Sequence, residues 1–402
     1  MTGSARQTIA LVFAVVMAVM LLVLPPKAWG QPPGQIVEGP GGARYVADEL
    51  IVTYAPEAAR ERVNAVGSKF GARTKEAVPG IDARLLSFPN GRGSLKRIKH
   101  TLKGNRAVES VDLNYFLEPT FTPNDPRFGD QYGLPQTRFP GAWDKTRGNA
   151  NVDIAIVDTG IDANHPDLAA KVSAQRDFTA TPEGKVAEDD AGHGTHVAGI
   201  AAAVTNNGKG VAGACPGCEL MAAKVVSGGL ASSYDTADAI VWAADNGAEV
   251  INVSLGAPSG SDALKNAVDY AWNHGAVVVA AVGNSGKEVR EYPAAYANAI
   301  AVAATAKDGY LASYSNYGTW VDVAAPGSGI ISTKLGGGYT TMSGTSMSVP
   351  HVAGLAGLLA AQDRSASGIR SRIENTATDL GTVGKDKYYG YGRINAYRAV
   401  GG

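Results

Sequence analysis

The sequence predicts an α/β protein in three layers, with a mainly parallel sheet between helices, preceded by a smaller α+β domain. From residue 121 onward, short and almost continuously apolar segments alternate with amphipathic ones. This alternation is typical of a parallel sheet whose two faces are covered by helices. Between residues 44 and 120 the order of strand and helix patterns is different, and a polar, proline-punctuated stretch separates the two regions.

The N-terminus has the pattern of a secretory signal. Arg6 precedes an unbroken run of 16 apolar residues, Ile9 to Leu24, and the small residues Ala28 and Gly30 follow. A membrane span needs about 20 apolar residues, so an uncleaved anchor is the weaker alternative. We therefore expect a signal peptide at 1–30, a proline- and glycine-rich linker at 31–43, and a secreted, extracellular protein.

Residues 44–120 are expected to form the small domain. The predicted elements are a strand at 49–55, a helix at 56–70, a strand at 83–89, a helix at 94–102 and a strand at 108–120. This order fits a ferredoxin-like βαββαβ sandwich.

Residues 121–402 are expected to form the large domain. Apolar runs predict strands at 152–160, 219–226, 249–256, 276–284 and 299–305. Helical spacing predicts helices at 196–205, 235–247, 264–275 and 349–362, with Pro350 in the first turn of the last one.

Charge and cysteine content narrow the function classes. The net charge is −1, with 36 Lys+Arg against 37 Asp+Glu, so nothing indicates a nucleic-acid partner. The two cysteines, Cys215 and Cys218, flank a Pro-Gly turn. A small disulfide and two free thiols are both compatible with this spacing, whereas a thioredoxin-like redox motif should open a helix and here precedes a strand pattern.

Polar residues stand where predicted strands end or helices begin. Asp158 and Asn284 end strands, while His193 and Ser346 lie at helix entrances. Each alone could be a cap or a turn residue. Together they supply a nucleophile, a base, a carboxylate that orients the base and an amide donor for an oxyanion, which are the parts that acyl transfer needs.

At these residues the sequence resembles the subtilisin-like serine proteases. The resemblance is carried by "DTGIDANHPDL", "GHGTHVAG", "SLG", "AAVGNSG" and "SGTSMSVPHVAG", and it covers essentially all of 121–402. It implies a subtilisin-like serine endopeptidase, a hydrolase acting on protein and peptide substrates, with Asp158, His193 and Ser346 as the triad and Asn284 in the oxyanion hole. It also implies that the substrate lies along Ser254, Leu255, Gly256, Ala280, Ala281 and Gly283.

The resemblance further implies structural Ca²⁺. Its ligands would be the side chains of Asp125, Asp167 and Asn207 and the carbonyls of Val204, Lys209 and Val211, an all-oxygen set that suits this ion. A second, weaker cation site would involve Ala294, Tyr296, Ala299 and Asp322.

Two further expectations concern specificity and maturation. Glu291 falls where the family places the floor of the pocket for the P1 side chain, so a basic P1 residue would be favoured unless Arg290 neutralises the carboxylate. The expected processing bond after Thr120 argues against this preference, because it would place threonine at P1. Residues 44–120 resemble the family's inhibitory pro-domain, which would act as intramolecular chaperone and inhibitor and be removed by a cut after Thr120. The zymogen would thus process itself, and the product is expected to be a monomer.

Two rival functions follow from other interpretations of the same residues. A catalytically inactive relative used as a binding module would be expected to lose one of the four site residues, and all are present. A zinc hydrolase would use His193 and His196, but zincin helices space the two histidines four apart with a glutamate between them.

Overall fold

The structure is a computed structural model, which describes residues 36–38, 44–55, 68–78, 80–88, 95–116, 121–179 and 186–401. The expected signal peptide, most of the helix at 56–70 and the segment before the expected processing bond lie outside these residues. The chain forms two units, residues 1–118 and 119–402, each described here by itself. No helix within the described ranges has the length and apolar character needed to cross a membrane.

The first unit is built on an antiparallel sheet. Its strands are β1 (Ile36–Glu38), β2 (Arg44–Tyr54), β3 (Arg73–Val78), β4 (Ala83–Ser87) and β5 (Val108–Tyr115), in the order β1-β2-β4-β3, with β5 on the other side of β2. Helix α3 (Leu95–Lys103) covers one face with Leu95, Ile98 and Leu102. Residues 36–38, which we placed in the linker, form β1 and pair with the start of β2. Strand β3, which we did not predict, is exposed along its whole length.

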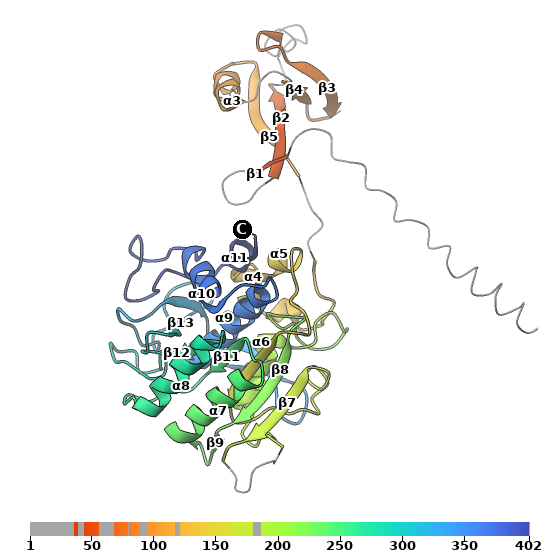
Figure 1. The fold of residues 1–402 in the computed structure, drawn as a ribbon. Coiled ribbons are helices and arrows are strands. Elements are labelled where there is room, and N and C mark those ends of the chain that lie inside the picture. The colour runs from red at the N-terminus through yellow and green to blue at the C-terminus, as the bar shows by residue number, and fades with distance from the viewer. Residues whose placement is uncertain are drawn as a thin grey trace, which may run out of the picture. The chain divides into compact units, whose positions relative to one another are not determined.

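The second unit contains a seven-stranded parallel sheet in the order β14-β13-β12-β11-β6-β8-β7 (Figure 1). The strands are β6 (Asp153–Asp158), β7 (Val172–Asp177), β8 (Glu219–Lys224), β11 (Val250–Val253), β12 (Val277–Ala281), β13 (Ala299–Thr305) and β14 (Val323–Pro326). Short hairpins are formed by β9 (Val226–Ser227) with β10 (Leu230–Ala231) and by β15 (Ile330–Thr333) with β16 (Tyr339–Met342). The mainly parallel sheet expected from the sequence is therefore confirmed.

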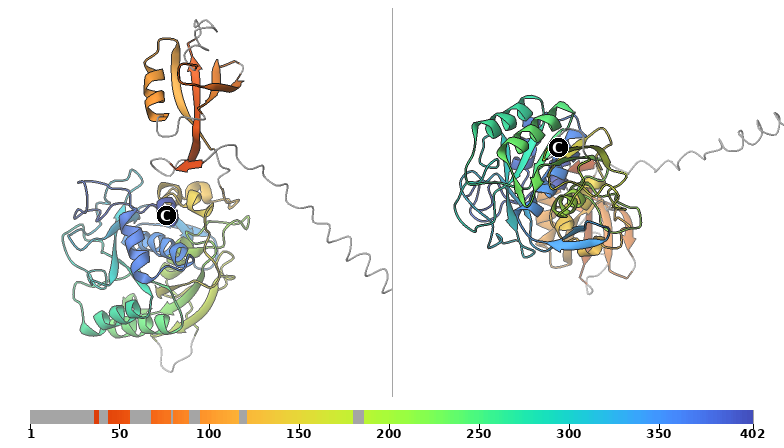
Figure 2. Two further views of the ribbon diagram at one scale, coloured as in Figure 1. Left: turned by 45° about the horizontal axis from the view of Figure 1, so that its top comes forward. Right: turned by 90° about the horizontal axis from the view of Figure 1, so that it is seen from below.

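Helices cover both faces of this sheet, as the two further views show (Figure 2). One face packs against α7 (Ser233–Asp245) and α8 (Asp262–Asn273). The other packs against α6 (His193–Ala202), α9 (Thr345–Ala360), α10 (Ala366–Asn375) and the short helices α4 (Gly133–Gln136), α5 (Phe139–Trp143) and α11 (Ala396–Val400). A single turn, η2 (Phe128–Asp130), precedes α4. The three-layer prediction holds.

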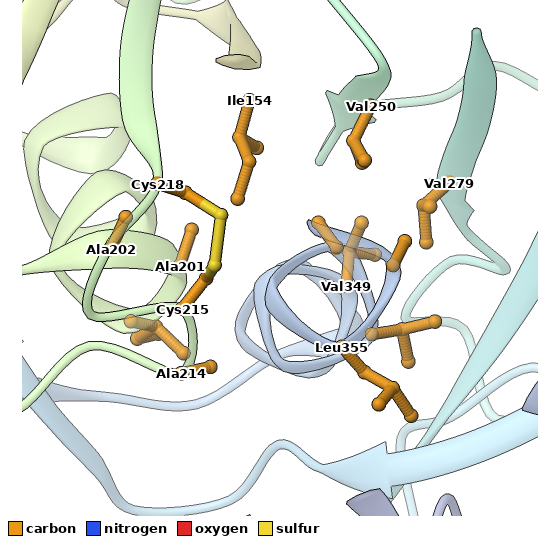
Figure 3. Close-up of a cluster of buried hydrophobic side chains, with 14 of the residues drawn as sticks. Ile154, Ala201, Ala202, Ala214, Cys215, Cys218, Val250, Val279, Val349 and Leu355 are labelled. Atoms are coloured by element: carbon orange, nitrogen blue, oxygen red, sulfur yellow. A yellow bond between two sulfur atoms is a disulfide. The ribbon is translucent and has the colours of Figure 1, made fainter. Parts of the chain in front are cut away.

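The core beside α9 includes a disulfide (Figure 3). Cys215 and Cys218 are bonded to each other and both are fully buried. Two glycines make room for the sulfur atoms: a Cβ on Gly148 would lie 2.4 Å from Cys215 Sγ, and one on Gly357 would lie 2.8 Å from Cys218 Sγ. Of the two alternatives that the spacing left open, the structure contains the bridge.

Candidate active site

The carboxyl ends of neighbouring strands bring the first site residues together. In the parallel pairing of β6 with β11, Val157 lies opposite Val253, so the next residues, Asp158 and Ser254, leave the sheet side by side. Strand β12 continues the row, with Ala280 opposite Val253. Sites in parallel α/β sheets form at this edge because the polar groups that end the strands converge there.

Asp158 holds His193 by a two-oxygen contact. The Nδ1 atom of His193 lies 2.8 and 2.9 Å from the two carboxylate oxygens of Asp158. The carboxylate is almost fully buried, whereas about a third of the imidazole is exposed. The charge of Asp158 raises the pKa of His193 against the opposing effect of burial. The contact fixes the tautomer that leaves Nε2 free to accept a proton.

A second buried carboxylate, which sequence reasoning missed, organises the start of α6. Asp189 accepts hydrogen bonds from the backbone N–H groups of Ala191, Gly192 and Thr195 and from two hydroxyls, those of Thr159 and Thr195. Burial alone would raise the pKa of Asp189, but these bonds lower it below its ordinary value. Asp189 thus fixes the turn from which His193 projects.

Ser346 is the second residue of α9, and its surroundings explain a difference from the predicted helix. Pro350 is the sixth helical residue rather than a first-turn residue, so it cannot donate to the carbonyl of Ser346. The hydroxyl of Ser254 donates to that carbonyl instead, at 3.0 Å. In return the Ser346 hydroxyl donates to the carbonyl of Ser254 at 2.9 Å and not to His193.

Asn284 is oriented by the residue before Ser346. Its side-chain oxygen accepts from the backbone N–H of Thr345 at 2.8 Å and from the Thr345 hydroxyl at 3.1 Å. The amide nitrogen is therefore the group that Asn284 presents as a donor. Neither Thr345 bond was predicted from the sequence.

The remaining predicted substrate residues surround a carboxylate. Leu255 is half-buried after β11, and Ala281 ends β12. A Cβ on Gly283, which has φ of 99°, would lie 2.3 Å from the carboxylate of Glu291, and one on Gly256 would lie 3.1 Å from it. The absence of side chains at these two positions thus leaves room for the Glu291 carboxylate.

Comparison with known proteins identifies the chain. The model of the "Subtilase family" matches residues 149–392, and that of the "Fervidolysin N-terminal prodomain" matches residues 31–114. The chain belongs to the subtilase family. It is a serine protease with an N-terminal prodomain.

Named relatives agree with this assignment. The chain is 46% identical to "Thermophilic serine proteinase" of Bacillus sp. (strain AK1), over 89% of this chain and 88% of the relative. It is 51% identical to thermitase of Thermoactinomyces vulgaris, over 70% of this chain and 99% of thermitase. Among solved structures, a protease from Pseudoalteromonas arctica PAMC 21717 matches with a TM-score of 0.65 and 33% identity, over 70% of this chain and 99% of that one.

In this subtilase, Glu291 has a neutral neighbour. Asn316 donates to its carboxylate at 3.3 Å, and burial raises the pKa of Glu291 while that bond lowers it. The guanidinium of Arg290 lies over the ring of Trp320 instead, 5.3 Å from its centroid. Within the described part of the chain Glu291 forms no ion pair, so the neutralisation by Arg290 that we considered is not observed.

The predicted calcium ligands of the subtilase lie together. Asp125 accepts from the backbone N–H groups of Asn206 and Asn207, and Asp167 accepts from the Asn207 side chain. Burial raises the pKa of Asp125, and the negative charge of Asp167 raises it further. Asp167 also accepts from the hydroxyl of Tyr339 at 2.8 Å, a contact that the sequence did not predict.

Three carbonyl-bearing residues of the expected ligand set lie in the same loop. The backbone N–H of Val204 donates to the backbone carbonyl of Asp167, and that of Val211 donates to the Asp167 carboxylate. The backbone N–H of Lys209 donates to the side-chain oxygen of Asn207. The described residues contain no cluster of three or more His, Cys, Asp or Glu suited to a metal. A cation here would rest on two carboxylates, one amide and carbonyls. Neither carboxylate forms an ion pair with a described residue, so this hard-oxygen donor set fits Ca²⁺.

Of the residues expected at the weaker cation site, Asp322 is paired within the protein. Arg370 and Lys385 each lie 3.1 Å from the Asp322 carboxylate. Arg370 also donates to the carbonyl of Ala297. Two side chains thus supply the positive charge for which we predicted a bound cation.

The two histidines of the HGTH block have separate partners. His196 is fully buried, and its Nε2 lies 3.1 Å from the carbonyl of Thr340 in β16, while Nδ1 has no partner among the described groups. Burial lowers the pKa of His196 to about 4. His193 is instead committed to Asp158, so the pair does not form a metal clamp.

Proposed function

We propose that this subtilase is a secreted serine endopeptidase that cleaves peptide bonds through an acyl-enzyme, and that it is made as a self-processing zymogen. The observation that carries the proposal is the two-oxygen contact between Asp158 and His193. It is supported by Ser254, which follows the strand next to that of Asp158 and whose carbonyl accepts from the Ser346 hydroxyl. In the substrate complex, His193 Nε2 takes the proton of the Ser346 hydroxyl as Oγ attacks the scissile carbonyl. Asp158 stabilises the imidazolium, which then protonates the leaving amine.

The charge that develops on the carbonyl oxygen would be met by two donors, the amide nitrogen of Asn284 and the backbone N–H of Ser346. The bonds from Thr345 to the Asn284 oxygen support this role, because they hold the amide in the donating orientation before substrate binds. Donors fixed in advance need no reorganisation in the transition state. In the free enzyme the Ser346 hydroxyl donates to Ser254, so it has to exchange this acceptor for His193.

The substrate would pair with the backbone of Ser254–Gly256 and of Ala280–Gly283 as an added strand. Glu291 would form the floor of the P1 pocket and favour Lys or Arg in peptide substrates, whereas the processing bond, held within the same chain, would place Thr120 at P1. The position of the Glu291 carboxylate between Gly256 and Gly283 supports this preference, as does the lack of a cationic partner in the described structure. A partly buried carboxylate with no counter-charge favours an incoming ammonium or guanidinium.

Exchange of Glu291 for glutamine tests this preference. We expect the ratio of kcat/KM for matched Lys and Phe P1 peptides to fall about tenfold or more, because the pair contributes at least about 1.4 kcal/mol. Glu288→Gln is the matched control, since Glu288 pairs with Lys387 on the surface. Equal rates for the two peptides with the unchanged enzyme would contradict the assignment.

Maturation would remove residues 1–30 on export and then the pro-domain at 44–120, by a cut after Thr120. In that product-like pose Leu117 would be P4 and Pro119 P2. These residues lie outside the described ranges, so the support is the match to a subtilase prodomain. The pro-domain would act as chaperone before the cut and as inhibitor after it.

Asp125, Asp167, Asn207 and the loop carbonyls of Val204, Lys209 and Val211 would hold Ca²⁺. The ion would supply positive charge to two buried carboxylates and take no part in bond cleavage. Burial and the negative charge of Asp167 raise the pKa of Asp125, and a bound cation would offset both effects by favouring the charged carboxylate.

A serine-directed phosphonylating reagent tests the catalytic proposal. We expect it to abolish peptidase activity and to add one phosphonyl group at Ser346, and we expect the Ser346→Ala chain to be inactive, unlabelled and uncut. Activity that survives the reagent and disappears on zinc removal would favour the zinc hydrolase. A chain with no activity that still binds peptides would favour the inactive binding module.

A further inference from the structure

Phe121, the first described residue after the gap at 117–120, is docked on α5. Its backbone N–H donates to the carboxylate of Asp144 at 2.7 Å. Its ring meets the ring of Trp143 edge-on, with 6.0 Å between centroids, and the guanidinium of Arg147 lies 3.9 Å from the Phe121 centroid on one ring face. Three neighbours from one short stretch therefore fix both the backbone nitrogen and the side chain of Phe121.

The groups that hold Phe121 are themselves well anchored. Trp143 is 2% exposed, and its indole N–H donates to the carbonyl of Ala214 at 3.0 Å. Arg147 donates to the carbonyl of Trp143. Asp144 caps the C-terminal end of α5. The groups that contact Phe121 thus belong to the folded second unit and not to the pro-domain.

We propose that hydrolysis of the Thr120–Phe121 bond creates an ion pair between the new α-ammonium of Phe121 and Asp144, so that α5 captures the mature N-terminus. This inference rests on the proposed self-processing. Water adds across the amide: the carboxylate stays on Thr120, and the nitrogen of Phe121 becomes an ammonium with three donors. The atom that donates to Asp144 is the same before and after the cut, but afterwards the hydrogen bond is charge-assisted and stronger.

The ion pair with Asp144 forms as described only when Phe121 is the N-terminal residue. A cut one residue earlier would leave the Phe121 nitrogen as a neutral amide, and a cut one residue later would remove Phe121 from the mature chain. The pairing would also anchor the segment that leads to Asp125, four residues further on.

The reactivity of the α-amine tests the ion pair in the enzyme as it matures itself. Mass spectrometry should find Phe121 at the N-terminus, and the pH dependence of its acylation should give the pKa of the amine. A free α-amine has a pKa of about 7.7–8.0, and an exposed partner should raise it by about half a unit. Among the charged groups nearby, Asp144 should raise the pKa of the Phe121 amine and Arg147 should lower it. The ammonium of Lys145 lies over the ring of Tyr397.

Two variants make the test specific. Asp144→Asn keeps an oxygen acceptor but removes the charge, so the amine pKa should return to the ordinary range. Asp363→Asn is the matched control: it removes one exposed charge that has no partner in the described structure and should leave the raised value unchanged. An amine pKa that is the same in the Asp144→Asn and unchanged enzymes overturns the inference.

The outcomes also separate this inference from the proposed function. An active enzyme whose N-terminus is another residue overturns the capture and leaves the proteolytic mechanism standing. A chain that neither cleaves peptides nor cuts itself overturns the proposed function. A cut at Phe121 together with the amine shift that Asp144→Asn abolishes supports both.

Discussion

At the scale of single residues, a neighbouring group holds each of two site side chains in a fixed orientation. Asp158 holds His193 with two oxygens, and Thr345 turns the amide of Asn284. The four residues that we propose as catalytic could be named from the sequence because their residue types and order are distinctive. The roles of Asp189 and Thr345 could not be predicted. Their residue types are common in helix caps and turns, and only their hydrogen-bond partners distinguish them.

The pH dependence of activity should report the Asp158–His193 pair. The charge of Asp158 raises the pKa of His193, and only the neutral imidazole can take a proton, so kcat/KM should fall as the pH drops through that raised value. In Asp158→Asn the charge is lost and burial remains, so the inflection should move to lower pH and kcat should fall by about 10⁴. Measured pH–rate profiles would contradict this role if the inflection stayed in place.

At the scale of elements, most apolar strands were predicted, whereas polar or glycine-rich strands and the short apolar strand β14 were missed. Strands β6, β11, β12 and β13 are buried on both faces and stand out as continuous apolar runs. Strand β7 (VSAQRD) is half-exposed at the sheet edge, and β15 and β16 flank a run of glycines, so their patterns carry little signal. Helix α9 begins before its predicted start because Ser254 compensates for Pro350.

That compensation can be measured as a double-mutant cycle. Ser254→Ala should lower the stability of the second unit by about 1–3 kcal/mol, because the Ser346 carbonyl loses its donor. In a Pro350→Ala background the new N–H of residue 350 can donate to that carbonyl, so the same substitution should cost less. Calorimetry on inactive His193→Ala chains gives both values; equal costs in the two backgrounds would show that the hydroxyl does not replace the missing helical bond.

At the scale of the whole molecule, the loop at 204–211 lies against two buried carboxylates, and Tyr339 of β16 donates to one of them. Asp125 and Asp167 repel each other, and no described side chain neutralises them. The acidic pair was predicted from family resemblance. The tyrosine could not be predicted, because its partner Asp167 lies 172 positions away in the sequence.

Chelation should therefore destabilise the mature enzyme. EDTA should lower its thermal midpoint and added Ca²⁺ should restore it, because binding to the native state adds free energy that grows with ligand concentration. Asp167→Asn should weaken this response, and Asp363→Asn should leave it intact. A thermal midpoint that is indifferent to EDTA and Ca²⁺ would argue against a bound cation in this loop.

The disulfide between Cys215 and Cys218 is fully enclosed beside α9. A soluble thiol cannot reach either sulfur while the core is closed, so reduction has to wait for the molecule to open. The rate at which free thiols appear in a native solution would then measure the rate of opening, and it could be measured long before any loss of activity. For a protease whose opened chains are digested by their neighbours, that interval sets the working lifetime of the preparation.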